Sequence, residues 1–407
     1  MLLRQTYLEK LLAAKGGGVV KVLTGVRRCG KSYLLKLLKN VLVAQGYDQD
    51  KFIEIDFERL EFSELRNPQE FYRYVKGQCA KRQIQFVFVD EVQELDEWAK
   101  TINGIRAEFN LDIYVTGSNS RMFVGEHLTY LSGRYIKIDV YPLSFSEYLQ
   151  FKNFEIGSGV DYEQTYDRYV QEGGFPAVVL AEDPFLKESL IDGLFDSIFM
   201  RDIILRGNIK DEMAFSRVAR FALDNIGNET SAYSIAKTFK AQNHSIKSDT
   251  VDNYLGLMVK AYLLYQCNRY DIRGKEHLST NGKYYVVDPG LRNRVLGQSG
   301  TNRGHMTENM VYLELLRKGY AVSVGVFSRI DTEIDFVATK KGERFYIQVS
   351  ESVLDEAVLE REIAPFSYIR DGYPRILITK DTADYSHGSV KHINLYKFLL
   401  GESELLT

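Results

Sequence analysis

Short apolar runs alternate with segments of helical spacing over the first third of the chain. The expected strands are Val19–Leu23, Phe52–Phe57, Gln85–Val89, Leu111–Val115 and Tyr135–Val140. Each of the first four runs is followed by a segment in which apolar residues recur at intervals of three and four positions. Strands that alternate with helices are typical of a parallel sheet with helices on both faces. The pattern therefore predicts an α/β domain that ends near Pro142.

The spacing becomes mainly helical from Ser144 to about Leu223, where the turn Gly173-Gly174-Phe175-Pro176 interrupts it. Two or three short helices are expected after this region, and the last of them is Ser248–Lys260, whose apolar residues share one face. The runs Ala261–Gln266 and Tyr284–Val287 are expected to be strands on either side of a polar loop. The pattern therefore predicts a helix-turn-helix followed by a β-wing.

The last part of the chain follows Asp288-Pro289-Gly290 and is expected to be an α+β region. It contains a β-hairpin in which Glu333–Thr339 and Arg344–Ser350 are joined by the turn Lys340-Lys341-Gly342. At 407 residues the whole chain is expected to form about two or three domains.

Composition is that of an ordinary soluble protein, with 45% hydrophobic and 26% charged residues. No apolar run approaches the roughly 20 residues that span a membrane, and charged residues interrupt Met1–Lys15 where a signal peptide would be apolar. We therefore expect a cytoplasmic protein without a membrane partner. The three cysteines, Cys29, Cys79 and Cys267, are widely spaced and favour neither a disulfide framework nor a zinc site.

The positive and negative charges of the whole chain nearly cancel, with a net charge of −3. This small net charge creates no global field that attracts nucleic acid. The first 50 residues nevertheless hold nine Lys and Arg against three Asp and Glu. This local excess suits a polyphosphate ligand, although a solvated basic helix face has the same composition.

A glycine-rich loop follows the first expected strand and precedes a helix expected over Tyr33–Val43. Its residues are Gly25-Val26-Arg27-Arg28-Cys29-Gly30-Lys31-Ser32, which match the P-loop pattern GxxxxGK[ST]. Glycines allow successive backbone N–H groups to turn toward phosphates, Lys31 reaches the β- and γ-phosphate oxygens, and the Ser32 hydroxyl coordinates Mg²⁺. We therefore expect these eight residues and Tyr33 to bind a nucleotide, ATP, together with Mg²⁺.

Two carboxylates follow the third expected strand in the sequence Phe86-Val87-Phe88-Val89-Asp90-Glu91. The carboxyl ends of parallel strands are where open α/β sheets place their ligands. Asp90 is expected to hold Mg²⁺ through water, and Glu91 is expected to orient and deprotonate the attacking water. Their position after a P-loop favours a Walker B pair over two unrelated surface acids.

Two further segments supply candidates for the reaction itself. Thr116-Gly117-Ser118-Asn119 ends the fourth expected strand, so Ser118 or Asn119 is a candidate sensor of the γ-phosphate, with a plain turn as the alternative. Leu131-Ser132-Gly133-Arg134 precedes the fifth expected strand, and Arg134 is a candidate arginine finger in cis or from a neighbouring subunit. A solvated or salt-bridged arginine is the alternative.

These motifs, with Tyr141-Pro142-Leu143-Ser144-Phe145 after the fifth strand, resemble those of a family of bacterial and archaeal AAA+ ATPases whose C-terminal domain has no known function. The resemblance spans nearly the whole chain. It implies an AAA+ core over residues 1–143, a helical lid over 144–222, a winged helix over 223–282, and a restriction-endonuclease-like α+β domain over 283–407. The family is similar to signalling or switch-like ATPases as well as to motor AAA+ proteins.

The resemblance also implies a nuclease-like site in the last domain, at Glu308, Asp335, Gln348 and Ser350. Such sites combine an acid on a helix with acids on two strands and a lysine, so that carboxylates hold Mg²⁺. Here Gln348 is a neutral amide in place of an acid, and Ser350 replaces the lysine. We therefore predict a degenerate site, which is compatible with a simple hydrogen-bonded core network around Glu308 and Asp335, and nuclease activity is not expected.

The sequence leaves three functions open. The first is a Mg²⁺-dependent ATPase that changes the conformation of a partner or remodels it, with DNA or a protein as that partner. The second is a nucleotide-dependent switch in signalling or defence with little turnover, and the third is an ATP-dependent nuclease. Asp249 and Asp252 accompany Lys260 in the helix that would enter a DNA groove, which disfavours tight DNA binding through that helix. A homo-oligomer is compatible with all three functions.

Overall fold

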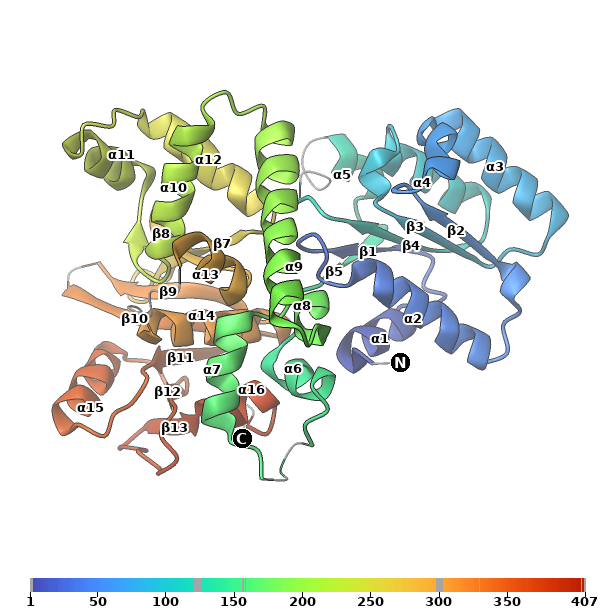
Figure 1. Cartoon of the computed structure of the whole chain (residues 1–407). Coiled ribbons are helices and arrows are strands. Elements are labelled where there is room, and N and C mark those ends of the chain that lie inside the picture. The colour runs from blue at the N-terminus through green and yellow to red at the C-terminus, as the bar shows by residue number, and fades with distance from the viewer. Residues whose placement is uncertain are drawn as a thin grey trace. The chain divides into compact units, whose positions relative to one another are not determined.

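The computed structural model describes residues 3–120, 126–155, 157, 159–297, 303–328, 330–403 and 405. The chain forms two compact units. The N-terminal unit comprises Met1–Pro142 together with Lys260–Tyr262, and the C-terminal unit comprises Leu143–Val259 and Leu263–Thr407. Helices and strands alternate in the first unit, whereas the second begins with a long helical region (Figure 1).

The N-terminal unit is built on a parallel sheet. Its strands are β1 (Val20–Thr24), β2 (Phe52–Asp56), β3 (Phe86–Asp90), β4 (Asp112–Gly117) and β5 (Tyr135–Asp139). All five lie within two residues of the predicted ranges, so the strand prediction is confirmed. Their order in the sheet is β2-β3-β4-β1-β5. Because β4 lies between β1 and β3, the carboxyl end of β4 adjoins the ends of both.

Helices alternate with these strands along the chain. They are α1 (Gln5–Ala13), α2 (Lys31–Ala44), α3 (Pro68–Lys81), α4 (Trp98–Glu108) and α5 (Glu126–Leu131), with 3₁₀ turns η1 (Gln49–Lys51), η2 (Leu60–Arg66) and η3 (Val92–Glu94). The α3 helix begins at Pro68. The side chain of the preceding residue, Asn67, accepts hydrogen bonds from two backbone N–H groups in the first turn of this helix. Every residue of β1 is buried, as expected for a parallel strand in a sheet covered on both faces.

The helical part of the C-terminal unit follows the predicted pattern. Its helices are α6 (Phe145–Phe151), α7 (Tyr162–Glu172), α8 (Pro176–Leu180), α9 (Pro184–Asp196), the π-helix η5 (Ser197–Leu205), α10 (Glu212–Asp224), α11 (Ala232–Ala241) and α12 (Ser248–Lys260). The predicted turn separates α7 from α8. The first helix starts with a capping box, in which Ser144 and Glu147 exchange side-chain to backbone hydrogen bonds.

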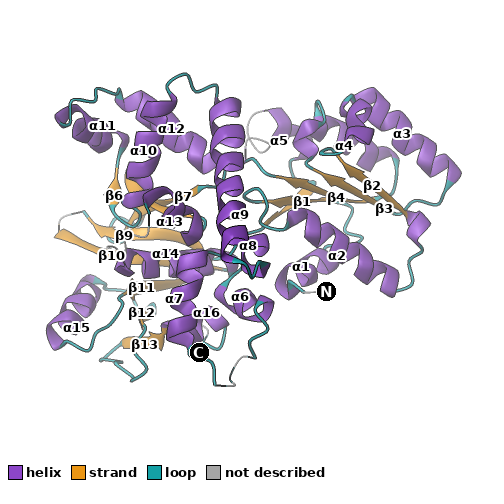
Figure 2. Ribbon diagram, in the orientation of Figure 1, coloured by secondary structure: helices purple, strands orange, loops and turns teal. Residues whose placement is uncertain are grey.

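The remaining helices of this unit accompany a large mixed sheet (Figure 2). The helices are α13 (Pro289–Leu296), α14 (Arg303–Arg317), α15 (Glu356–Ile363), η6 (Ala364–Tyr368) and α16 (Leu395–Leu400). The strands are β6 (Glu229–Thr230), β7 (Leu264–Asp271), β8 (Glu276–Val286), β9 (Ala321–Phe327), β10 (Ile330–Lys340), β11 (Glu343–Val349), β12 (Arg375–Thr379) and β13 (Val390–Asn394). Their order is β13-β12-β11-β10-β9-β7-β8-β6.

The predicted β-hairpin in this sheet is confirmed. Strands β10 and β11 are antiparallel, with Lys340 opposite Glu343. The two residues between them, Lys341 and Gly342, have φ angles of 51° and 87°. Positive φ at both positions is the geometry of the tight turn that matches the twist of paired strands.

The strands predicted on either side of the polar loop form the antiparallel pair β7 and β8. They do not stand apart as a separate wing, because β7 also pairs in parallel with β9 and joins the rest of the sheet. The expected boundary between residues 282 and 283 falls within β8. The local sequence pattern does not reveal a pairing between strands that are this far apart in sequence. The four-part division of the chain remains a prediction.

Candidate functional site

The glycine-rich loop turns the chain sharply between β1 and α2. Gly25 has a φ of 148°, and a Cβ atom there would lie 2.0 Å from the Val140 carbonyl oxygen. Gly30 has a φ of 105° and no side chain with which to cap α2, which begins at Lys31. Both positions therefore require glycine. The uncapped N-terminus of α2 offers its first N–H groups and the positive end of its dipole to an anion such as phosphate.

Lys31 lies against this loop. It is 3% exposed, and its Nζ atom donates hydrogen bonds of 3.0 Å to the carbonyl oxygens of Gly25 and Val26. The ammonium group is thus held within the loop that phosphates would occupy. Among the other loop residues, Arg27 forms a 2.8 Å ion pair with Glu58, and burial raises the pKa of the Cys29 thiol. A buried neutral thiol is a structural group.

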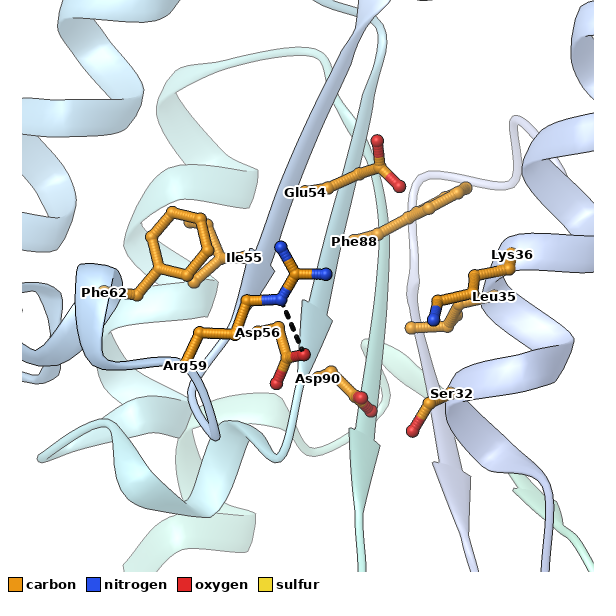
Figure 3. A pocket seen from close by; sticks show the side chains of 10 residues that line it. All are labelled: Ser32, Leu35, Lys36, Glu54, Ile55, Asp56, Arg59, Phe62, Phe88 and Asp90. Carbon is orange, nitrogen blue, oxygen red and sulfur yellow. Dashed lines mark ion pairs between the residues drawn. The ribbon is translucent and has the colours of Figure 1, made fainter. Parts of the chain in front are cut away.

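Ser32 and Asp90 lie side by side in the lining of a cavity of about 310 Å³, which Asp56 and Arg59 also line (Figure 3). Burial raises the pKa of Asp90 above its ordinary value, and hydrogen bonds from the Ser32 and Thr116 hydroxyls oppose that rise. Hydroxyl and carboxylate oxygens are the ligands that Mg²⁺ takes from proteins. Ser32 and Asp90 therefore fit the metal of a bound nucleotide, with the cavity leaving room beside them.

Glu91 is buried and ordered by several hydrogen bonds. It has a φ of 52°, and its backbone N–H donates to Thr116 Oγ1 at 3.0 Å. Ser118 donates its hydroxyl to Glu91 Oε2 at 2.9 Å, and the Gln93 amide donates to the same oxygen. Burial opposes ionisation, but the Lys31 ammonium and these donors hold the Glu91 pKa below its ordinary value. The carboxylate is therefore charged and can accept a proton.

Of the two sensor candidates, Ser118 forms a hydrogen bond with the Glu91 carboxylate. Asn119, the next residue in the sequence, is buried, with 5% exposure. Sequence reasoning passed over Thr116 and Gln93. Thr116 contacts both Asp90 and Glu91 because β4 lies next to β3 in the sheet. A signal was present in the motif Thr116-Gly117-Ser118-Asn119, but only the strand order shows which of its hydroxyls face the acids.

Arg134 lies at the other end of the sheet. Its carbonyl oxygen accepts the Val20 N–H at 2.9 Å, and Val20 begins the strand whose far end, Thr24, leads into the P-loop. A strand of this length spans about 13 Å at about 3.3 Å per residue. The Arg134 side chain is exposed. The structure therefore does not bring the backbone of Arg134 to the P-loop of its own chain, and its role as an arginine finger remains a prediction.

The predicted nuclease-like residues of the C-terminal unit are partly brought together. Glu308 on α14, Asp335 on β10 and Gln348 on β11 lie in one cluster, where Gln348 Oε1 accepts the Asp335 N–H at 2.7 Å. Ser350 lies just beyond β11, and its hydroxyl donates to the Ser352 carbonyl oxygen at 3.3 Å. Sequence reasoning missed Lys283 on β8, whose Nζ atom is 3.1 Å from Glu308 Oε1.

Within the part of the chain that the structure describes, no group of three or more His, Cys, Asp or Glu side chains is arranged to hold a metal ion. In that same part of the chain, no helix combines the length and the apolar character needed to cross a membrane.

Comparison with known proteins places these features in a family. Residues 18–149 match the family model described as an AAA domain, so the parallel sheet and its glycine-rich loop form an AAA domain with the fold of P-loop ATPases. Residues 163–302 match a domain of unknown function, DUF8612. The chain belongs to one family with an uncharacterized protein of Haemophilus influenzae, to which it is 39% identical over 381 residues, or 93% of each chain.

A more distant relative is an uncharacterized protein of Methanocaldococcus jannaschii, 30% identical over 85% of this chain and 78% of that protein. Among solved structures, a Walker-type ATPase of Pyrococcus abyssi is 15% identical, with a TM-score of 0.45 over 72% of this chain and 96% of that one. The Orc1 protein of Aeropyrum pernix, solved with DNA, is 11% identical, with a TM-score of 0.33 over 74% of this chain and 93% of that one.

Proposed function

We propose that the protein binds ATP with Mg²⁺ at the P-loop and hydrolyses it. The observation that carries this proposal is the placement of Glu91. Its carboxylate is buried at the end of β3, in the sheet that carries the P-loop, and accepts hydrogen bonds from Ser118 and Gln93. A base in this position, next to a phosphate-binding loop, is what attack by water on a γ-phosphate requires.

The residues divide the work of the reaction. Lys31 and the backbone N–H groups at the start of α2 would position the phosphates, with Gly25-Val26-Arg27-Arg28-Cys29-Gly30 and Tyr33 forming the rest of the binding loop. Ser32 and Asp90 would hold Mg²⁺, which neutralises phosphate charge when bound. Glu91 would accept the proton of the attacking water, and Ser118 with its neighbour Asn119 would orient Glu91 and sense the γ-phosphate.

The C-terminal unit is the part on which ATP turnover would act, to change the conformation of a DNA or protein partner. We assign it a helical lid, a winged helix and an endonuclease-like domain, over residues 144–222, 223–282 and 283–407. The grouping of Glu308, Asp335 and Gln348, three of the four positions that the resemblance implies, supports the last assignment. A cytoplasmic location and a homo-oligomeric assembly complete the proposal.

Two substitutions test the site. Lys31→Ala should abolish nucleotide binding, whereas Glu91→Gln should keep ATP binding and slow turnover by about 10²- to 10⁴-fold, the usual contribution of a general base. The exposed Lys76 and Glu97 provide the matched controls Lys76→Ala and Glu97→Gln, both of which should hydrolyse ATP at the wild-type rate. Normal turnover in Glu91→Gln would rule out its role as the base.

The partner is tested by the same assay. The steady-state ATPase rate should be measured with and without single- and double-stranded DNA, with the mass of the particle recorded in ATP and in ADP. Stimulation by DNA would support remodelling of a nucleic-acid complex. Slow turnover that DNA leaves unchanged, together with an assembly that differs between ATP and ADP, would support the nucleotide-dependent switch instead.

A further inference from the structure

A buried lysine lies at the centre of the carboxylate cluster in the C-terminal unit. The Lys283 side chain is 5% exposed, and its Nζ atom is 2.8 Å from Glu333 Oε1, 3.1 Å from Glu308 Oε1 and 3.8 Å from Asp335 Oδ1. These carboxylates come from α14 and β10, whereas the lysine comes from β8. One ammonium group is therefore shared by three acids on two other elements.

The rest of the cluster is satisfied by protein donors. Glu308 Oε1 accepts the Tyr285 hydroxyl at 2.5 Å, and His305 Nδ1 is 3.6 Å from Glu308 Oε2. Asp335 Oδ2 accepts the Val349 N–H at 2.8 Å. The amide oxygen of Gln348, which would otherwise be a candidate metal ligand, accepts the Asp335 N–H. Glu308 Oε1, Asp335 Oδ2 and Gln348 Oε1 thus each accept a hydrogen bond from a protein donor.

This arrangement does not fit a divalent metal. Mg²⁺ requires oxygens at about 2.0 to 2.1 Å in nearly octahedral geometry. The oxygens of Glu308 and Glu333 instead face a buried ammonium within 3.1 Å, which would repel a second cation. The lysine also differs from that of the expected motif, since position 350 is a serine and the ammonium arrives from a strand that precedes Glu308 in the sequence.

We propose that Lys283 is an internal cation that takes the place of the divalent metal in this endonuclease-like cluster. The native C-terminal unit therefore holds no metal at Glu308, Glu333 and Asp335 and does not cut DNA. The ammonium instead compensates the buried Glu308 carboxylate, which would be costly to leave unpaired. It thereby ties β8, which crosses the predicted boundary between the winged helix and the endonuclease-like domain, to α14 and β10.

Titration of the full-length chain with Mn²⁺, without nucleotide, tests this proposal. All proteins carry Ser32→Ala and Asp90→Asn, which alter both proposed metal ligands of the nucleotide site. The parent protein should show no Mn²⁺-dependent rise in melting temperature. Lys283→Met, a neutral side chain of similar length, should melt at a lower temperature and regain several degrees in Mn²⁺. Adding Asp335→Asn to Lys283→Met should abolish that recovery.

Several outcomes would overturn the proposal. One is a Lys283→Met protein that folds but gains nothing from Mn²⁺. Another is Mn²⁺ binding by the parent protein that Asp335→Asn removes, a measurement that remains available if Lys283→Met fails to fold. DNA cleavage supplies an independent readout, for which none is expected from wild-type protein in Mg²⁺ or Mn²⁺. Cleavage that Lys283→Met abolishes would make Lys283 the lysine of a working nuclease site. None of these results depends on whether the P-loop hydrolyses ATP.

Discussion

At the scale of single residues, the surroundings of two acids set the pKa values in the candidate ATPase site. Asp90 and Glu91 are consecutive, and burial raises the pKa of Asp90. At Glu91 burial also acts to raise the pKa, but the Lys31 and Arg27 charges and the hydrogen bonds from Gln93 and Ser118 together lower it. Environments that push the pKa values of neighbouring groups apart are how one site assigns them different tasks. Glu91 is therefore the acid that is ionised over the wider range of pH.

The hydroxyl of Ser118 contributes to that assignment. Because it donates a hydrogen bond to ionised Glu91, Ser118→Ala should raise the Glu91 pKa. The base would then ionise only at higher pH, so the acid limb of the pH profile of kcat/KM should move to higher pH. Ser132→Ala, which removes an exposed hydroxyl of the same unit, is the control. An acid limb that stays in place in Ser118→Ala would contradict this role.

Asp335 provides a second test by pH. Burial and then the neighbouring Glu308 charge raise its pKa well above the ordinary value in the folded protein. The folded chain thus retains a proton that the unfolded chain releases, and stability should fall as the pH rises from about 4 through the raised pKa. Asp335→Asn should show a smaller fall over that window in denaturant unfolding. The exposed control Glu360→Gln should follow the wild type, and an unaltered slope in Asp335→Asn would contradict the expectation.

At the scale of elements, the turn between α7 and α8 is shaped by a residue far away in sequence. Asp288 caps α13, since its Oδ1 accepts the Leu291 N–H at 3.2 Å. Its other oxygen, Oδ2, accepts the Gly174 N–H at 2.6 Å. Gly173 has a φ of 82°, and a Cβ atom there would lie 2.2 Å from Asp288 Oδ1. The end of α7 and the start of α13 therefore depend on the same carboxylate.

This contact predicts unequal effects of two glycine substitutions in the C-terminal unit. Gly173→Ala should destabilise the protein by about 2 to 4 kcal/mol, because it combines a positive φ with a collision against a buried acid. Gly256→Ala, within α12 and with no atom within 4 Å of the new Cβ, should stabilise it by about 0.5 to 1 kcal/mol. Urea unfolding measures both changes. Equal stabilities would show that the turn relaxes around the added methyl group.

At the scale of the whole molecule, the position of Arg134 bears on whether one chain can hydrolyse ATP by itself or needs a neighbouring chain. Its backbone pairs with Val20, at the end of the sheet away from the P-loop. An arginine that is needed for turnover but lies there must reach the nucleotide of another copy. A catalytic role of Arg134 therefore requires that the protein forms an oligomer.

Arg134→Ala should lower turnover by about 10³-fold with little loss of ATP affinity, because a finger acts on charge that develops in the transition state. Mixing Arg134→Ala with Glu91→Gln protein should restore part of the activity, since a mixed interface joins an intact base to an intact arginine. Arg73→Ala, at an exposed position on α3, should match the wild type. Wild-type turnover in Arg134→Ala would assign this residue to structure or solvent.

The sequence by itself determined the local features of the protein. The strands of the parallel sheet, helix α12, the turn between α7 and α8 and the β10–β11 hairpin agree with the pattern of apolar residues and glycines, because these patterns act over a few neighbouring positions. The P-loop and the Asp90-Glu91 pair were also recognisable, since each is a continuous segment whose own backbone shapes it. The helix α2 begins two residues earlier than predicted, within the P-loop motif.

Only the tertiary structure decided which distant residues meet. The sheet order brings Thr116 and Ser118 to Asp90 and Glu91, the start of β5 holds Arg134 away from the P-loop, and β7 joins the hairpin to the C-terminal sheet. Lys283 likewise reaches Glu308 and Asp335 from another strand. Such contacts depend on pairing between strands that are far apart in sequence, and pairing of this kind leaves no periodic signal along the chain.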